Sequence, residues 1–169
     1  MRVEFAGEFA ELQRFADRIE KMPRALVTVS EQLAEETIEL IREGFESSTD
    51  PDGNPWKPPL LRDGKPLEDT GGLKSSWHRK FAVAHGFGVA NAKSYAIHNQ
   101  RGTGIYGPRH KRIYPITARA LRLGKTGLYA RSVAGAPARK MVPDHGLPER
   151  WRRRYLDTAQ EVLTEVFRK

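Results

Sequence analysis

The sequence D-P-D-G-N-P-W at residues 50–56 opens the most specific part of this chain, and the other elements are organised around it. Its prolines, glycine and polar side chains predict a tight loop that places one large aromatic residue, Trp56. D-T-G-G-L follows at residues 69–73, where paired glycines suit a backbone that turns through positive φ before a new element starts. A third motif, Y-A-I-H-N-Q-R-G, occupies residues 95–102.

Together and in this order, the three motifs resemble those of the phage virion morphogenesis family, the tail completion proteins of Mu-like contractile-tailed phages. That family has an N-terminal helical segment, an F-x-x-x-x-D-P-D-G-x-P-W loop, T-G-x-L and Y-A-x-x-H-x-x-G elements, a P-A-R step and a C-terminal helix. The matching positions here are Phe45, Asp50, Pro51, Asp52, Gly53, Trp56, Thr70, Gly71, Leu73, Tyr95, His98, Gly102 and Arg139. The family usually continues P-A-R with an apolar pair, whereas this chain has Lys140, Met141 and Val142.

The resemblance implies a non-enzymatic virion assembly protein of a phage or prophage, which completes the tail at its head-proximal end so that tail and head can join. It implies other tail and neck proteins as partners, a homo-oligomeric ring of six copies, and no cofactor or small-molecule substrate. The protein would then be found in the host bacterial cytoplasm during assembly and in the virion. The motif residues would fix loops, and other surfaces would make the contacts.

Length and composition limit the number of domains, the size of the core and the kinds of site that this chain can have. The 169 residues suit a single domain, and 38% hydrophobic with 30% charged residues predicts a modest core. The chain contains no cysteine, which excludes disulfides, thiolate metal sites and a cysteine nucleophile. The N-terminus lacks an apolar signal region, and no run of eighteen apolar residues occurs, so we expect a cytoplasmic protein that does not span a membrane.

The net charge of +8 is unevenly distributed. Residues 1–46 hold eleven acidic and six basic side chains, a balance of −5, while residues 101–154 hold fourteen basic and two acidic, a balance of +12. This asymmetry fits either a nucleic-acid face or head-to-tail packing of like subunits. Three acidic side chains, Glu35, Glu36 and Glu39, are candidates for a contact with the basic region of the next subunit, and a solvated helix face is the alternative.

Apolar spacing predicts helices at both ends of the chain. Residues 8–22 form one amphipathic pattern, and Pro23 opens a second one that continues to residue 46, which predicts a helical hairpin. Pro148 opens a C-terminal helix over residues 147–169. Its first turns carry Arg150, Arg152, Arg153 and Arg154. Because these arginines oppose the helix dipole, we expect an anionic group to compensate them.

Between the helices the sequence predicts loops and strands. Residues 47–72 read as a Pro/Gly loop, and residues 73–142 as a β-rich core. Strands are expected at about 75–84 and 87–91 with a turn at His85-Gly86, and at 113–116, 120–123 and 127–133 with a turn at 124–127. Residues 95–102 are compatible with a helical turn or a strand. Residues 101–115, rich in glycine and basic residues, are expected to form a mobile arm.

Neither a metal site nor catalysis is predicted. The five histidines lack H-x-x-x-H or H-E-x-x-H spacing, no G-x-S-x-G surrounds Ser75 or Ser76, and the two glycine-rich runs lack the flanks of a phosphate loop. His98 is the histidine most worth following, as a hydrogen-bonding residue.

Nonspecific nucleic-acid binding is the alternative function. Arg109, Lys111 and Arg112 lie between Tyr106 and Tyr114, which is a composition that grips phosphates and stacks on bases. Arg152, Arg153 and Arg154 form a second basic cluster. No sequence signature of a specific DNA- or RNA-binding module accompanies them.

The fold class that follows is α+β. We expect an antiparallel sheet or a partly rolled β-barrel, packed by the long N-terminal helical segment and the C-terminal helix, with long irregular loops.

Overall fold

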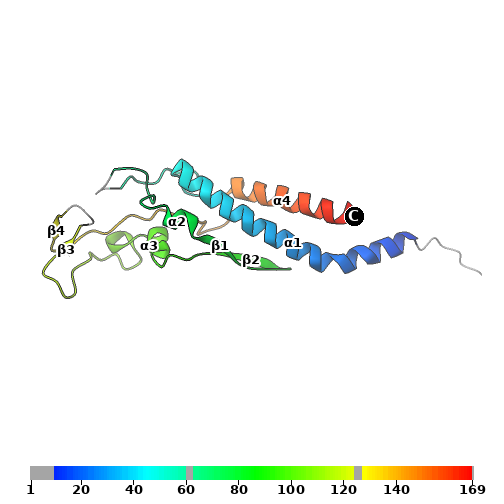
Figure 1. The fold of residues 1–169 in the computed structure, drawn as a ribbon, viewed down its shortest axis with the longest axis horizontal. Coiled ribbons are helices and arrows are strands. Elements are labelled where there is room, and N and C mark those ends of the chain that lie inside the picture. Colours follow the sequence, from blue (N-terminus) through cyan, green and yellow to red (C-terminus); the bar gives the residue numbers. More distant parts are fainter. Residues whose placement is uncertain (1–9, 60–62, 124–126, 169) are drawn as a thin grey trace, which may run out of the picture.

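The structure is a computed structural model that describes residues 10–59, 63–123 and 127–168, and it is α+β as predicted. The described helices are α1 (Ala10–Ser47), α2 (Gly72–Ser75), α3 (Ala96–Arg101), a 3₁₀ turn (Gly104–Tyr106) and α4 (Glu149–Arg168). The described strands are β1 (Trp77–Val83), β2 (Gly86–Asn91), β3 (Leu121–Arg122) and β4 (Tyr129–Ala130). The chain is elongated, with α1 and α4 side by side and the β3–β4 end remote from the free end of α1 (Figure 1).

Helix α1 runs for 38 residues with Pro23 inside it, so the predicted helical hairpin is wrong. Pro23 removes one backbone hydrogen bond and crowds the carbonyl one turn earlier, which costs about 3 kcal/mol in a helix interior. The apolar spacing continues across Pro23 from Ile19 to Leu26, and Ile19, whose carbonyl loses its donor, is an exposed residue. The apolar stripe on both sides of Pro23 therefore belongs to a single helix, although the proline had predicted two.

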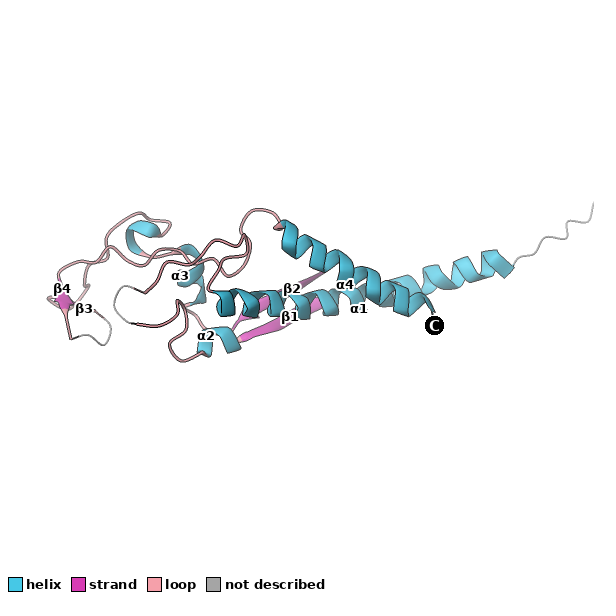
Figure 2. Cartoon of the chain, turned by 90° about the horizontal axis from the view of Figure 1, so that it is seen from above, coloured by secondary structure: helices cyan, strands magenta, loops and turns pink. Residues whose placement is uncertain are grey.

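Strands β1 and β2 form the antiparallel hairpin expected from the alternating pattern, with Trp77 opposite Asn91 and Val83 opposite Gly86. The turn consists of Ala84 and His85, and Gly86 is already the first residue of β2. The expectation that glycine makes this turn is therefore wrong. Helix α1 packs along both strands, which places it over the hairpin when the molecule is seen from above (Figure 2).

The remaining strands are shorter than predicted and form a separate sheet. Only Leu121 and Arg122 pair with Ala130 and Tyr129. One isolated bridge joins Ile113 to Val133. The described part of the chain thus holds two separate two-stranded sheets, which rules out a closed barrel. Most of the predicted turn at 124–127, like the short N-terminal strand considered for residues 1–5, lies outside the described residues.

The segment after α3 has definite backbone partners, which its composition did not suggest. Thr103 donates its N–H to the Ala136 carbonyl at 2.9 Å, and Ile105 donates to Ala134 at 2.8 Å. The two backbones cross so closely that a Cβ on Gly104 would lie 2.0 Å from the Ala134 carbonyl oxygen. Residues 103–113 are therefore held against residues 133–136. The motif at residues 95–102, left open between helix and strand, forms α3.

Helix α4 begins directly after Pro148, as predicted, and lies antiparallel to α1. The core forms where the C-terminal half of α1 meets the loops and the start of α4. Its buried members are Leu40, Ile41, Phe45, Trp56, Leu73, Met141 and Trp151. Three of the residues that the sequence motifs single out, Phe45, Trp56 and Leu73, are therefore members of the core.

Candidate functional site

The loop at residues 50–56 closes on itself through its first residue. The Asp50 carboxylate accepts the backbone N–H of Asn54 at 2.8 Å, and the Asp50 carbonyl accepts the Gly53 N–H at 2.9 Å. Pro51 is buried, Asp52 is exposed, and Gly53 has a φ of 89°. This geometry satisfies the polar groups of the turn locally, so the loop is a fixed support.

The loop delivers Trp56 to the core. The indole packs edge-on against Phe45 with ring centroids 5.4 Å apart, and its Nε1–H donates to the Lys140 carbonyl at 3.0 Å. The side chain retains 8% exposure. Trp56 therefore joins the end of α1 to the segment that follows the P-A-R step.

Arg139 of the P-A-R step connects the same two segments as Trp56, but here the donor belongs to the later segment and the acceptors to the loop. Its side chain is buried, with Nε donating to the Lys57 carbonyl at 2.9 Å and Nη2 to the Pro58 carbonyl at 3.2 Å. Its backbone N–H donates to the Asn99 carbonyl at 2.8 Å. One arginine thus fastens three segments, and the guanidinium fork explains the choice of residue, because a lysine could not donate to two carbonyls in a fixed plane.

The D-T-G-G-L motif starts α2 and anchors the hairpin. Gly71 is the residue before α2 and has a φ of 72°, and Leu73 is buried in the core. The Leu73 carbonyl accepts the side-chain amide of Asn91 at 2.8 Å, which ties the end of β2 to this turn.

The Y-A-I-H-N-Q-R-G motif contributes a cap and two exposed side chains. Tyr95 and His98 are exposed on α3, whereas Gly102 is buried after its last residue with a φ of 75°. A Cβ at Gly102 would lie 2.8 Å from the Tyr106 carbonyl oxygen and 2.9 Å from the Ala138 nitrogen. A side chain there would combine backbone strain with a clash, so this position requires glycine.

Gln100, in the same motif, is a structural residue that sequence reasoning missed. Its Oε1 accepts the Met141 N–H at 2.7 Å and the Val142 N–H at 3.2 Å. Its Nε2 donates to the Val142 carbonyl at 2.7 Å and to Asp144 Oδ1 at 2.8 Å. Burial raises the pKa of Asp144, but the hydrogen bond from Gln100 and the charge of Lys140, 3.2 Å away, outweigh it, so that pKa is lowered.

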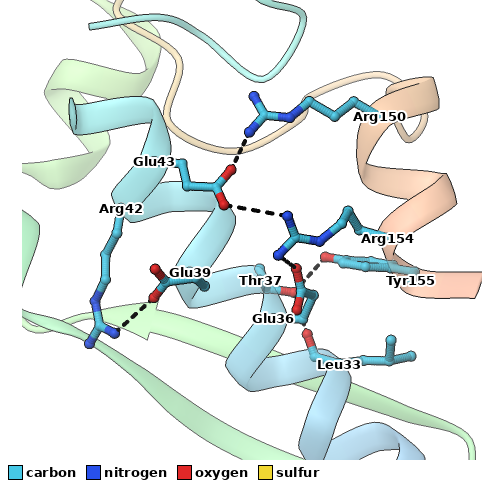
Figure 3. Close-up of polar contacts among 9 residues, drawn as sticks. All are labelled: Leu33, Glu36, Thr37, Glu39, Arg42, Glu43, Arg150, Arg154 and Tyr155. Carbon is cyan, nitrogen blue, oxygen red and sulfur yellow. Dashed lines mark hydrogen bonds and ion pairs between the residues drawn. The ribbon is translucent and has the colours of Figure 1, made fainter. Parts of the chain in front are cut away.

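The acidic side of α1 meets the arginines of α4 within the same chain (Figure 3). Arg154 Nη2 lies 2.5 Å from Glu36 Oε1, and its Nη1 lies 3.4 Å from Glu43 Oε1. Arg150 also forms an ion pair with Glu43. Glu36 and Glu43 of α1 therefore compensate two of the four arginines at the start of α4, Arg150 and Arg154.

A hydrogen-bonded chain lies beside these ion pairs. The Thr37 hydroxyl lies 2.7 Å from the Leu33 carbonyl, to which it can donate, and 2.5 Å from the Tyr155 hydroxyl, where either oxygen can be the donor (Figure 3). Burial raises the pKa of Tyr155; the Thr37 hydrogen bond opposes this and the Glu36 charge adds to it, and the net shift is upward.

The other predicted charged contacts have different surroundings. Arg79 Nη1 of β1 lies 3.9 Å from Glu35 Oε1, and Glu39 pairs with Arg42 one turn along α1 at 3.2 Å. Arg152 pairs with Glu149 at 3.8 Å. Arg153 is exposed.

A basic depression of about 660 Å³ brings α3 and the following segment together. Its walls carry His98 and Arg101 from α3, and Arg109, Lys111 and Arg112 from the segment after the 3₁₀ turn. Arg112 Nε donates to Ser132 Oγ at 3.0 Å. No acidic residue is among the described residues that line this depression, so it presents one sign of charge. Candidate residues from two separate motifs thus share one surface.

Across residues 10–59, 63–123 and 127–168, no three His, Asp or Glu side chains gather in a way that could hold a metal ion. Within those ranges, no helix combines the length and the apolar character needed to cross a bilayer.

Comparison with known proteins found no match to this chain among protein-family models, curated proteins or solved structures.

Proposed function

We propose that this chain is a structural virion assembly protein of a phage or prophage, which completes the tail at its head-proximal end and acts without catalysis. The phage assignment rests on the ordered motifs of the sequence. The observation that carries the structural role is the use made of those motifs: Trp56 and Arg139 cross-connect the loop at 50–58 with the segment at 139–142. Residues used in this way build a rigid support for a surface.

The proposed working form is a ring of six copies, a number taken from the resemblance alone. Not every charged residue proposed for the contacts between subunits is available for them, because Glu36 already pairs with Arg154 inside one protomer. Reversing Glu36 would therefore damage the α1–α4 packing of the monomer itself. Glu35, Glu39, Arg152 and Arg153 remain exposed, and the ion pairs of the first three are on the surface, so these four groups can still contact a neighbouring subunit.

The test uses electron microscopy of lysates from a phage or prophage lacking this gene. We expect tails that fail to join filled heads, and joined particles when the wild-type chain is supplied in trans. An Arg139→Leu variant should complement poorly, because it releases the loop carbonyls of Lys57 and Pro58. Normal joined particles in the complete absence of the chain would refute the proposal.

A second candidate function is nonspecific contact with nucleic acid, which the basic depression favours. Its cationic side chains come from two segments and face one cavity, as a groove that tracks a phosphate backbone requires.

The experiment for this candidate is an electrophoretic mobility assay at about 50 and 200 mM salt, a range over which phosphate-dependent binding falls steeply. Replacing Arg109, Lys111 and Arg112 by glutamine should weaken retention and reduce the salt slope by about three. The matched control replaces three exposed arginines outside the depression, Arg119, Arg152 and Arg153, by glutamine. Equal loss in both variants, or no retention of the wild type at low salt, would exclude the basic depression as a nucleic-acid site.

A further inference from the structure

The N-terminal part of α1 extends past its only long helical neighbour in the described structure. Tyr155 lies opposite Thr37 in the antiparallel α1–α4 pair. Both helices rise by about 1.5 Å per residue, so Arg168, thirteen residues after Tyr155, lies opposite about residue 24. Residues 10–23 therefore project beyond the end of α4, as Figure 1 shows.

The projecting part keeps an apolar stripe that nothing in the described chain covers. Phe15 is 63% exposed and Ile19 56%, and Met22 and Leu26 are also exposed, whereas Val29, opposite α4, is only 8% exposed. These large apolar side chains are neighbours on one face of the helix, so together they form one continuous exposed apolar patch. Such a contiguous patch marks an interaction surface.

The spacing of the stripe identifies the kind of partner. Phe15, Ile19, Met22, Leu26 and Val29 follow one another at intervals of four, three, four and three residues. This is the a/d pattern of a seam that packs against another α-helix. The seam ends at Val29, which is buried at a level of α1 that α4 reaches, so a helix packed on the seam would begin where the cover of α1 by the rest of the chain ends.

The charges beside the seam favour a copy of the same helix. Residues 10–24 carry acidic Glu11, Asp17 and Glu20 and basic Arg14, Arg18, Lys21 and Arg24. Three acidic against four basic groups give this part a charge of +1 in a chain of +8. Two copies therefore meet here with little net repulsion, and opposite charges are available on both sides of the contact.

We propose that the seam Phe15–Ile19–Met22–Leu26 is a self-association surface, covered in solution by the same seam of a second copy of this chain. The contact is short, about three helical turns on each side, and falls below the size of a permanent interface. It should form in a concentration-dependent way. The inference does not depend on the proposed function, because it follows from the helix alone.

Sedimentation velocity of the full chain, from about 5 to 300 µM, tests the proposal through mass action. We expect the wild type to shift from one chain to two across this range. Ile19→Glu places a charge in the seam and should leave a single-chain species throughout, with at least a tenfold weaker association. Gln13→Glu adds the same charge to an exposed position away from the seam and should behave as the wild type.

Both substitutions occur at exposed helix positions and introduce a good helix former, so the melting temperature of the monomer should not change. A wild type that remains a single chain at every concentration would overturn the proposal. So would an association that Ile19→Glu leaves intact, since another surface would then be responsible.

Cysteine cross-linking gives a second, independent readout, because the natural chain has no cysteine. Ile19→Cys should yield a disulfide-linked pair of chains under mild oxidation, and Gln13→Cys should yield at least tenfold less. Equal cross-linking at both positions would indicate random collision and would refute the seam.

Discussion

Trp56→Ala is the most direct test of the core arrangement. The indole fills the space between Phe45 and the start of the 140–142 segment and donates to the Lys140 carbonyl. Truncating a large buried aromatic costs about 3–5 kcal/mol. For a domain of this size each kcal/mol lowers Tm by about 2–4 °C, so a fall of about 6–20 °C is expected.

Trp56→Phe separates the two contributions. It keeps most of the contact with Phe45 but leaves the Lys140 carbonyl without its donor, so a loss of about 1–2 kcal/mol is expected. The assay is urea unfolding followed by far-ultraviolet circular dichroism, which avoids the fluorescence of Trp77 and Trp151. Tyr95→Ala, at an exposed motif aromatic, is the control and should change stability by less than about 0.5 kcal/mol. A loss below about 1 kcal/mol for Trp56→Ala would show that Trp56 is not part of the core.

Three further predictions concern the polar contacts. In a double-mutant cycle of Glu36→Gln and Arg154→Gln, the coupling should be about 1 kcal/mol at low salt and shrink at high salt, because the Arg154 side chain is 42% exposed; zero coupling at low salt would contradict the ion pair. Because the pKa of Tyr155 is raised above 10.0, its contribution to stability is complete below pH 10 and is lost as pH rises through the folded-state value. The Tm of the wild type should therefore fall more steeply above about pH 10 than that of Tyr155→Phe, and parallel curves would count against this. Gln100→Leu should cost about 1–3 kcal/mol in chemical denaturation, since it leaves the buried Met141 N–H without an acceptor, and an unchanged midpoint would refute that role.

The elements that were predicted correctly depend on local patterns. Pro148 and the apolar spacing after it located α4, and residue alternation located the β1–β2 hairpin. The arginines at the start of α4 also predicted an anionic neighbour, because the positive end of the helix dipole is unfavourable for cations. None of these inferences needs knowledge of distant residues.

The errors arose where distant parts of the chain decide the structure. The break predicted at Pro23 did not occur, since the apolar stripe on both sides of it belongs to one helix. Gln100 gave no signal, because its four side-chain hydrogen bonds all reach residues more than 40 positions later in the sequence. The backbone contacts between residues 103–113 and 133–136 gave no signal either, because backbone groups leave no trace in a side-chain pattern.

The pairing of α1 with α4 has a consequence for synthesis on the ribosome. The two helices are separated by about 100 residues, so α1 emerges long before the α4 side chains that pack against it. At about 5–20 residues per second, the side of α1 that faces α4 stays uncovered for roughly 5–20 s. During that interval the nascent chain presents a long amphipathic helix without its partner, which is the state most open to chaperones and to helices of neighbouring nascent chains.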